Sequence, residues 1–415
     1  MNYRSRGLEA KIIGGVDHYG AILLTGPRQA GKSTLLRHVA QSIWGTAWTE
    51  FSFDTPMDIA AFRSDPDLFF LNHPGPLLLD EVQNVPDIFP WLKKQVDLSP
   101  GKTQFLLTGS QHFPLMRGVA ESMAGRVLVL DLYPLAQKEI FGLKTLDIAE
   151  QFLDPKKFVA QVGQTFPCSD TENVFPAMLQ GGYPAQSLQH LGPDWFKSYR
   201  ATYLQRDILN LGYVENIAAF DRFLVLCAGL SGTIPNKANL ADHLGVNAKT
   251  VDAWMSLLEK GYQAIQIPAW SQNTTKRVAK RPKFIFGDSG LALHLQAIRD
   301  SEALLGAPHF GNLFEAWVIT ELQRVFSCAA LEFDAYHWRT ANGQECDLVL
   351  RAGNSLIPIE FKHTAKPSAS DVKGVIAFRK EYKEATTGLL ISMKPTLEWI
   401  VPGILNIPLG VLVAK

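Results

Sequence analysis

The segment GPRQAGKST, residues 26–34, has the residue types that bind the phosphates of a nucleotide. Its glycines let backbone N–H groups surround phosphate oxygens, Lys32 can reach the outer phosphates, and the Ser33 hydroxyl can ligate Mg²⁺. The segment stands between an apolar strand pattern, AILLT, and an amphipathic helix pattern, a context that an accidental glycine-rich turn would not need. We therefore expect ATP and Mg²⁺ to bind at this set: Gly26, Pro27, Arg28, Gln29, Ala30, Gly31, Lys32, Ser33 and Thr34.

Two adjacent acids, Asp80 and Glu81, follow a second apolar run in PLLLDEVQ. From the end of a strand, Asp80 is predicted to hold Mg²⁺ through Ser33 or a water molecule, and Glu81 to polarise the attacking water. Without such a role, two adjacent acids at a strand end would be unfavourable on a protein surface. The two motifs together predict ATP hydrolysis.

A third apolar run, TQFLLTGSQ, ends in Ser110 and Gln111, small polar groups that would lie beside the γ-phosphate. A helical segment, then Arg126, then the strand pattern RVLVLDL follow it. This order resembles the core of the AAA+ ATPases. The resemblance implies that Ser110 or Gln111 is the polar sensor and that Arg126 reaches the nucleotide of a neighbouring subunit, in a homo-oligomer. The alternative for Arg126 is a solvated cation at a helix end.

A second candidate site combines Glu315 in a helical pattern, Asp347 entering a strand, and Glu360 and Lys362 on a later strand. Strand alternation puts Glu360 and Lys362 on one face and Phe361 on the other. This set suits metal-dependent cleavage of a phosphodiester: Asp347 and Glu360 would hold Mg²⁺, and Lys362 would stabilise charge or help activate water.

The pattern around Glu360 and Lys362 resembles the PD-(D/E)xK nuclease fold. Two other interpretations stay open. One is an exposed charged strand with a structural aspartate, and the other is an intact fold that binds nucleic acid or a protein without cutting.

Residues 237–260 predict a helix, a turn at Gly245 and a second helix with Asn247 as its N-cap, and a two-stranded wing would follow. A winged-helix module of this kind would bind double-stranded DNA or contact a protein. Contact with DNA phosphates would use Lys249 and the basic residues of the wing, although Asp252 and Glu259 on the second helix count against it. These basic residues are Lys276, Arg277, Lys280, Arg281 and Lys283.

Seven segments look, in their order, like a bacterial and archaeal family of AAA-type ATP-binding proteins with a C-terminal domain of unknown function, DUF4143. They are LLLDEVQNVP, LLTGSQ, SMAGRVLVLDLYPL followed by Glu139, GGYP, YLQRDI, LFEAWVITEL and IPIEFK. The resemblance implies ATPase chemistry, and a nuclease-like fold for the C-terminal domain. Arg206 and Asp207 of YLQRDI match a motif of this family in a helical lid, where Arg206 would either contact phosphate or form a salt bridge within the lid.

The pattern of apolar and polar segments along the chain predicts an α/β protein of several domains. Short apolar strands alternate with helices up to about residue 140, which predicts a parallel sheet with helices on both faces. We expect an AAA-type P-loop domain over residues 1–142, a helical lid over 143–213, a winged-helix module over 214–298, and a restriction-endonuclease-like α/β domain over 299–415.

Composition excludes several protein classes. The 40 basic and 40 acidic residues balance, so a nucleic acid or a membrane would have to bind a local basic patch. The four cysteines are far apart and form no CxxC pair, which argues against a zinc site or a disulfide framework. Neither a signal peptide nor an apolar run of membrane-spanning length is evident, so we expect a cytoplasmic protein without a membrane partner.

Two functions fit these features. In the first, ATP hydrolysis gates a DNA-acting domain with nuclease activity. In the second, the protein is a nucleotide-dependent switch or scaffold that binds a protein partner through a catalytically silent nuclease-like fold.

Overall fold

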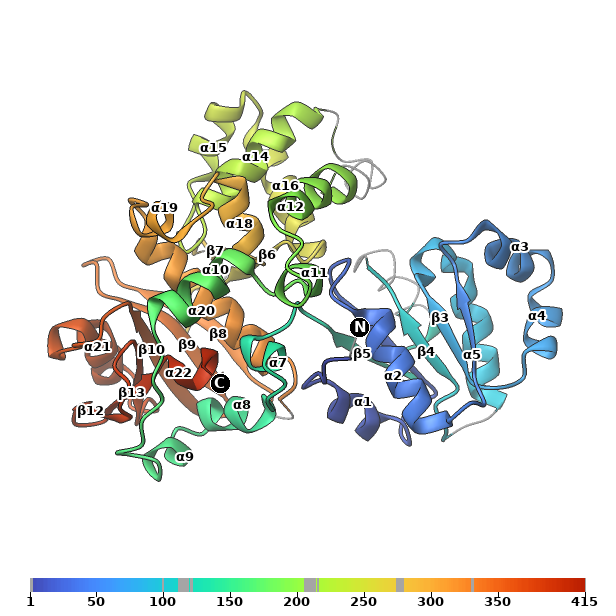
Figure 1. Cartoon of the computed structure of the whole chain (residues 1–415), viewed down its shortest axis with the longest axis horizontal. Helices are drawn as coiled ribbons and strands as arrows, with labels where there is room; N and C mark the ends of the chain where they lie inside the picture. Colours follow the sequence, from blue (N-terminus) through green and yellow to red (C-terminus); the bar gives the residue numbers. More distant parts are fainter. Residues whose placement is uncertain are drawn as a thin grey trace. The chain divides into compact units, whose positions relative to one another are not determined.

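The computed structural model describes residues 3–98, 101–110, 119, 122–204, 214, 216–273, 280–329 and 332–414 (Figure 1). These residues form two compact units. Unit 1 comprises Met1–Pro134 with the short segment Lys260–Tyr262, and unit 2 comprises Leu135–Glu259 with Gln263–Lys415. Within the described ranges, no helix is both long enough and apolar enough to cross a membrane.

Unit 1 contains a five-stranded sheet in the order β2-β3-β4-β1-β5, and every neighbouring pair is parallel. The predicted parallel α/β sheet is therefore confirmed. Because β1 lies between β4 and β5, the loop after β1 starts inside the sheet, where α/β proteins bind ligands at the carboxyl ends of strands. The strands are β1 (Ala21–Thr25), β2 (Thr49–Ser52), β3 (Leu77–Asp80), β4 (Phe105–Thr108) and β5 (Val127–Asp131).

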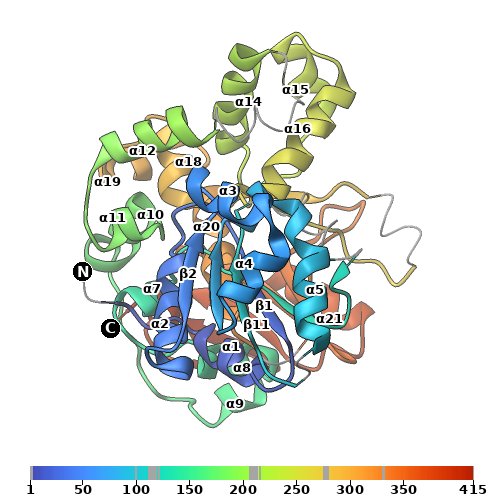
Figure 2. The same ribbon diagram turned by 90° about the vertical axis from the view of Figure 1, so that its right-hand side faces the viewer.

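Helices cover both faces of this sheet. Ile22 and Leu24 face α1 and α2, whereas Ala21 and Leu23 face the aromatic core under α3, α4 and α5, because side chains alternate along β1. Figure 2 shows α3, α4 and α5 over the second face. The helices are α1 (Glu9–Gly15), α2 (Lys32–Trp44), α3 (Pro56–Ser64), α4 (Pro66–Asn72), η1 (Val82–Asn84), η2 (Pro86–Ile88) and α5 (Phe89–Leu98).

Unit 2 contains a six-stranded mixed sheet in the order β12-β13-β11-β10-β9-β8. Strands β10, β11 and β13 are parallel, and the strands outside them are antiparallel to their neighbours. Helix α20 (Phe310–Phe326) packs on the face with Ile359, and α21 (Lys373–Glu381) on the face with Leu390. The strands are β8 (Asp334–Arg339), β9 (Glu345–Ala352), β10 (Ser355–Lys362), β11 (Gly388–Ser392), β12 (Glu398–Val401) and β13 (Ile404–Pro408).

Three helices and a two-stranded ribbon precede that sheet. Gly245, in the left-handed region, ends α15, and the Asn247 side chain accepts a 2.8 Å hydrogen bond from Thr250 N as an N-cap does. After β6, Trp270 N donates to His337 O of β8 at 2.6 Å, so the chain that enters the predicted wing adjoins the six-stranded sheet. The elements are α14 (Ile217–Gly229), α15 (Lys237–Leu244), α16 (Ala248–Lys260), β6 (Ala264–Ile267) and β7 (Lys283–Phe286).

Short helices complete unit 2. The segment expected as a lid, as far as it is described, consists of such helices, and Arg206 and Asp207 lie outside the described residues. The helices are α7 (Gln137–Ile140), α8 (Leu146–Leu153), α9 (Lys156–Val159), η3 (Asp170–Val174), α10 (Phe175–Gln180), α11 (Pro184–Ser187), α12 (Pro193–Tyr199), η4 (Arg200–Leu204), α18 (Ser289–Leu295), α19 (Ser301–Leu305), η5 (Ala369–Val372) and α22 (Gly410–Val413).

A buried ionic network joins distant segments of unit 2. Arg324 on α20 pairs with Asp288 at 3.0 Å and with Glu321 at 2.5 Å, and all three side chains are at most 2% exposed. Asp288 also accepts from Gly182 N at 2.8 Å, and a Cβ on Gly182 would lie 2.5 Å from Leu135 O. Only glycine fits so close to another backbone, which gives the GGYP motif a structural reason.

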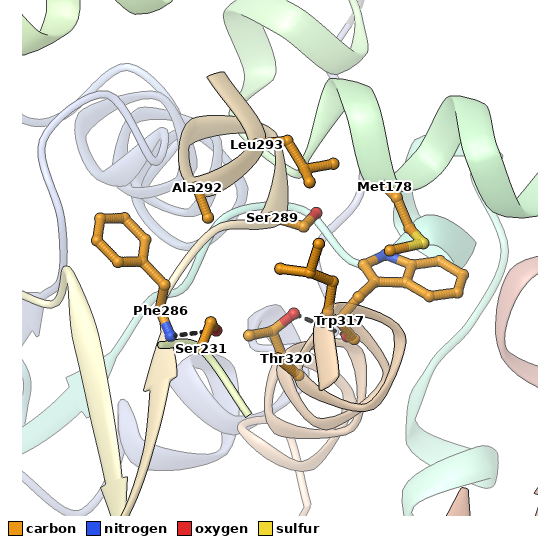
Figure 3. A pocket seen from close by; sticks show the side chains of 10 residues that line it. Met178, Ser231, Phe286, Ser289, Ala292, Leu293, Trp317 and Thr320 are labelled. Carbon is orange, nitrogen blue, oxygen red and sulfur yellow. Dashed lines mark hydrogen bonds between the residues drawn. The ribbon is translucent and has the colours of Figure 1, made fainter. Parts of the chain in front are cut away.

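A small cavity lies between α10, α18 and α20 (Figure 3). Its lining is mostly apolar, but within the described ranges the Ser289 hydroxyl and the Trp317 indole N–H have no hydrogen-bond partner. The space suits about one water molecule, which could satisfy both groups. The cavity is therefore too small to be a substrate pocket.

Candidate functional site

The loop after β1 has the conformation that a phosphate-binding loop needs. Gly26 has φ 139°, and a Cβ there would lie 2.1 Å from Leu132 O, so no other residue fits. Gly31 has φ 96° and immediately precedes α2, whose first residues are Lys32, Ser33 and Thr34. The loop therefore presents the N-terminus of a 13-residue helix at the carboxyl edge of the sheet, where backbone N–H groups attract anions.

Lys32 is buried at the base of this loop. Its Nζ donates to the carbonyls of Gly26 and Pro27, at 3.0 Å each. Arg6 supports the loop from another side, because Nη1 donates to Ala30 O at 3.0 Å and Nη2 to Tyr133 O at 2.6 Å. Our sequence reading missed Arg6, since an isolated arginine 24 residues before its partner belongs to no local pattern.

Ser33 and Asp80 meet at the expected place. Ser33 Oγ donates to Asp80 Oδ1 at 2.6 Å, and the Thr108 hydroxyl at the end of β4 donates to the same oxygen. Thus three neighbouring polar groups come from α2, β3 and β4. A hydroxyl and a carboxylate are ligands that Mg²⁺ accepts, so these side chains fit the ion.

Glu81 is held in one orientation by two side chains. Ser110 Oγ donates to Glu81 Oε2 at 2.9 Å, and Gln83 Nε2 donates to the same carboxylate and to Ser110 Oγ, the latter at 3.1 Å. Glu81 has φ 55°, a backbone conformation that is uncommon outside glycine and is found at functional sites. Sequence reasoning missed Gln83 and Thr108, although both lie inside the motifs PLLLDEVQ and TQFLLTGSQ. Gln111 lies outside the described residues.

Arg126 contacts a different part of unit 1. Its Nε donates to Asp97 Oδ1 on α5 at 2.5 Å, and both side chains are more than one third exposed. The hydrogen bond and charge of Asp97 raise the pKa of Arg126 above its usual value. The guanidinium is thus a surface cation paired with Asp97, and the carbonyl of Ala124 accepts a 3.3 Å hydrogen bond from it.

The second predicted set also comes together, inside unit 2, but with one additional member. Lys283, the first residue of β7, is buried and its Nζ forms an ion pair with Glu315 of α20. The same nitrogen lies 3.8 Å from Asp347 Oδ1 and 3.4 Å from Asp347 O. Glu360 and Lys362 pair at 2.8 Å on β10.

This position corrects the prediction that Lys283 belongs to the basic wing surface. The residue begins a strand and its ammonium needs anionic partners once it is buried, which Glu315 and Asp347 provide. Lys280 and Arg281 are exposed, whereas Lys276 and Arg277 lie outside the described residues.

Burial and mutual repulsion change the acidity of this cluster. Burial first, and then the charge of Asp347, raise the pKa of Glu315 and of Glu360 to about 8. For Lys283 and Lys362, burial lowers the pKa but the neighbouring carboxylates outweigh it, so both pKa values are raised. The lysines therefore stay charged at neutral pH, while the two glutamates bind protons more readily than exposed glutamates do.

The cluster, as the structure places it, does not fit a divalent metal. The described parts of the chain contain no group of three acidic, histidine or cysteine side chains arranged around one point for a metal ion. Lys283 already occupies the approach to Glu315 and Asp347. The oxygen chemistry would suit Mg²⁺, and Glu360 Oε2 is buried without a hydrogen-bond partner among the described residues. The three carboxylates are, however, not arranged around one point as a metal ion requires.

Three family models match consecutive parts of the chain. They are an AAA domain over residues 18–141, a domain of unknown function (DUF8612) over 171–302, and a domain of unknown function (DUF4143) over 310–410. Two relatives, uncharacterized protein Rv2008c of Mycobacterium tuberculosis and uncharacterized protein Mb2031c of Mycobacterium bovis, are each 30% identical over 374 residues. The alignments cover 89% of this chain and 76% of each relative.

The chain belongs to the AAA-domain proteins with a C-terminal DUF4143 domain. The AAA model coincides with the strands and the phosphate loop of unit 1, and the DUF4143 model with α20 and the six-stranded sheet of unit 2. The DUF8612 model ends between β7 and α20, so Lys283 lies in a different matched region from Glu315, Asp347 and Glu360.

Solved structures show only a distant likeness. The Walker-type ATPase PABY2304 of Pyrococcus abyssi is 13% identical with a TM-score of 0.42, over 71% of this chain and 99% of that chain. A RuvB variant of Thermotoga maritima is 16% identical with a TM-score of 0.31, over 66% of this chain and 91% of that chain. Similarity at this level says nothing about function.

Proposed function

We propose that unit 1 binds and hydrolyses Mg-ATP. The observation that carries this proposal is the 2.6 Å hydrogen bond from Ser33 to Asp80, at the start of a helix that opens directly from a glycine-rich loop. Beside it, Glu81 is oriented by Ser110 and Gln83. Phosphoryl transfer to water requires a loop that binds the phosphates, ligands for Mg²⁺ and a carboxylate that orients the attacking water.

The residues of the site have separate tasks in this reaction. Lys32 Nζ would exchange its two carbonyl partners for the outer phosphates, and Ser33 and Asp80 would hold Mg²⁺. Bound Mg²⁺ neutralises charge on the phosphates. Glu81 would accept a hydrogen bond from the attacking water and draw away its proton, while Ser110 and Gln83 keep the carboxylate in place.

Two substitutions test the ATP site. Lys32→Ala should abolish binding of a fluorescent ATP analogue, because the loop loses the ammonium that reaches the outer phosphates. Glu81→Gln should bind the analogue like the wild type but hydrolyse ATP about 10²- to 10⁴-fold more slowly. Equal turnover by Glu81→Gln and the wild type would remove Glu81 from the catalytic role.

We propose that Arg126 acts on the nucleotide of a neighbouring subunit, because its side chain is partly exposed and it precedes β5 beside the amino end of β1, whereas the phosphate loop follows the carboxyl end of β1. Arg126→Ala keeps a complete nucleotide loop, and Lys32→Ala keeps the arginine. Mixing the two inactive variants should then restore part of the ATP hydrolysis. A mixture with no more activity than its components would leave Arg126 as a surface cation paired with Asp97.

For unit 2, the contacts favour the switch or scaffold over the nuclease. The ammonium of Lys283 and the pair formed by Lys362 and Glu360 already neutralise most of the acidic cluster, which leaves little negative charge to hold a catalytic metal. We propose that ATP turnover in unit 1 controls how unit 2 binds a protein partner through a catalytically silent nuclease-like fold.

A DNA-acting role is the second candidate. The three helices and the ribbon β6-β7 suit a winged helix, and Lys280 and Arg281 are exposed at its base. Supercoiled plasmid incubated with Mg²⁺ or Mn²⁺, with and without ATP, distinguishes the two roles. Nicking that disappears in Asp347→Ala would establish the nuclease, whereas intact plasmid and no salt-dependent DNA binding would support the switch.

A further inference from the structure

The ammonium of Lys283 is surrounded by oxygens that belong to a different part of unit 2. Its neighbours are Glu315 Oε1 on α20, Asp347 Oδ1 at 3.8 Å and Asp347 O at 3.4 Å on β9. The ammonium donates hydrogen bonds to Glu315 Oε1 and Asp347 O, while Asp347 Oδ1 contributes its negative charge at 3.8 Å. The side chain is 11% exposed, which leaves little room for solvent to compete.

The two acids that Lys283 contacts are two of the three carboxylates in this cluster. The third, Glu360, uses Oε1 for Lys362, and its buried Oε2 has no hydrogen-bond partner in the described part of the chain. Asp347 and Glu360 continue the register of β9 and β10, in which Ile359 pairs with Leu348, so they lie opposite each other across the two strands. Buried polar atoms are nearly always hydrogen-bonded, so the free oxygen of Glu360 marks an incomplete site.

An ammonium and a divalent ion cannot share these oxygens. Mg²⁺ or Mn²⁺ would have to lie about 2 to 2.2 Å from the carboxylate oxygens. An ion at that distance would overlap the ammonium group of Lys283. In a poorly solvated site, repulsion between the two cations would add to the steric conflict. The carboxylates can therefore bind either Lys283 or a metal.

We propose that Lys283 is the resident cation of this cluster and that it keeps divalent metals away from Glu315, Asp347 and Glu360. Loss of the lysine charge would leave Glu315 and Asp347 without their cation, so that these side chains and Glu360 can draw together around a divalent metal instead. The inference concerns unit 2 alone and goes beyond the proposed ATP hydrolysis. It also gives a physical reason for the silent nuclease-like fold, because the cation comes from the chain itself.

Mn²⁺ binding to the full-length protein without nucleotide tests the proposal, with free Mn²⁺ counted by electron paramagnetic resonance at neutral pH. The wild type should show no binding that depends on Asp347. Lys283→Met should gain one Mn²⁺ per chain, with an affinity at least about tenfold higher than any wild-type binding, and Lys283→Met combined with Asp347→Asn should lose it. Lys280→Met is the matched control, since Lys280 is exposed and lies outside the cluster.

Two outcomes would overturn the proposal. One is Mn²⁺ binding by the wild type that Asp347→Asn removes, because the lysine would then not exclude the metal. The other is a folded Lys283→Met chain that gains no Mn²⁺. If Lys283→Met does not fold, Lys283→Gln replaces it, since glutamine can donate a hydrogen bond to Glu315 without the charge. ATP hydrolysis by the same preparations reports on unit 1 separately.

Discussion

At the scale of single residues, the ATP site depends on side chains that orient other side chains through hydrogen bonds. Glu81 has an unfavourable backbone conformation, and Ser110 and Gln83 both donate to its carboxylate. Ser110 is fully buried, and the Gln83 carbonyl oxygen has no hydrogen-bond partner among the residues that the structure describes. A free acceptor beside an oriented carboxylate suits a water molecule that both groups would hold.

We therefore expect Gln83→Leu to lower kcat for ATP hydrolysis by about 10- to 100-fold, because Glu81 loses a donor and the water an acceptor. The dissociation constant of an ATP analogue should not change, since the side-chain amide of Gln83 donates to Glu81 and Ser110 and not to the described residues of the phosphate loop. Asn84→Ala is the matched control: that side chain donates to Phe53 O and to Asp54, away from Glu81. An equal loss of kcat in both variants would contradict the positioning role.

A second residue-scale prediction concerns His337. Burial lowers the pKa of His337 to about 4, and its neutral ring must donate Nε2–H to Arg281 O because a carbonyl only accepts. The unfolded chain binds the proton near pH 6.5, so the free energy of unfolding decreases as the pH falls below that value. Between pH 7.5 and 5 the loss from this residue is about 2 kcal/mol.

His337→Asn removes the titrating group, so its stability deficit relative to the wild type should shrink by about that amount over the same pH interval. Urea unfolding of both proteins at the two pH values measures the change. A difference that stays constant with pH would show that His337 is not protonated differently in the folded and unfolded states.

At the scale of elements, α20 connects unit 2 through charges as well as through its apolar faces. Arg324 pairs with Asp288, which also caps α18 by accepting from Leu291 N at 3.0 Å. Its other partner, Glu321, accepts from Gln137 N at 2.9 Å at the start of α7. Three helices therefore meet at one buried guanidinium.

Arg324→Met should lower the free energy of unfolding of unit 2 by about 3 to 5 kcal/mol, because two buried carboxylates lose their counter-ion. The matched control is Arg339→Met. Arg339 lies 3.7 Å from Glu345 in an ion pair whose side chains are both more than half exposed, and such pairs contribute less than about 1 kcal/mol. Similar losses in the two variants, measured by urea unfolding, would show that the buried network is not stabilising.

At the scale of the whole molecule, the chain forms two compact units, each with its own core, and the ATP site lies within unit 1. We expect calorimetry to show two unfolding transitions. A non-hydrolysable ATP analogue with Mg²⁺, at about 100 times its dissociation constant, should stabilise one transition by about 2.7 kcal/mol. Lys32→Ala should abolish that shift. A single transition that shifts as a whole would mean that the units unfold together.

The sequence alone determined the family, the parallel sheet and the segments that form the nucleotide loop. These features depend on contiguous residues: a strand, a glycine-rich turn and a helix follow one another, and glycine is required wherever the backbone has a positive φ and no room for a Cβ, as at Gly26. Parallel strands also end at one edge of a sheet, which brings Asp80 next to Ser33 without further information.

The partners of Lys283 are evident from the folded chain and not from its sequence. In the sequence it is one of several cations in a segment without acids, which indicated a wing for DNA. Its actual partners, Glu315 and Asp347, lie 32 and 64 residues further along the chain. No local pattern encodes such a contact, because it depends on how β7 packs against α20 and β9. For the same reason, Arg6 and the Arg324 network could not be predicted from spacing.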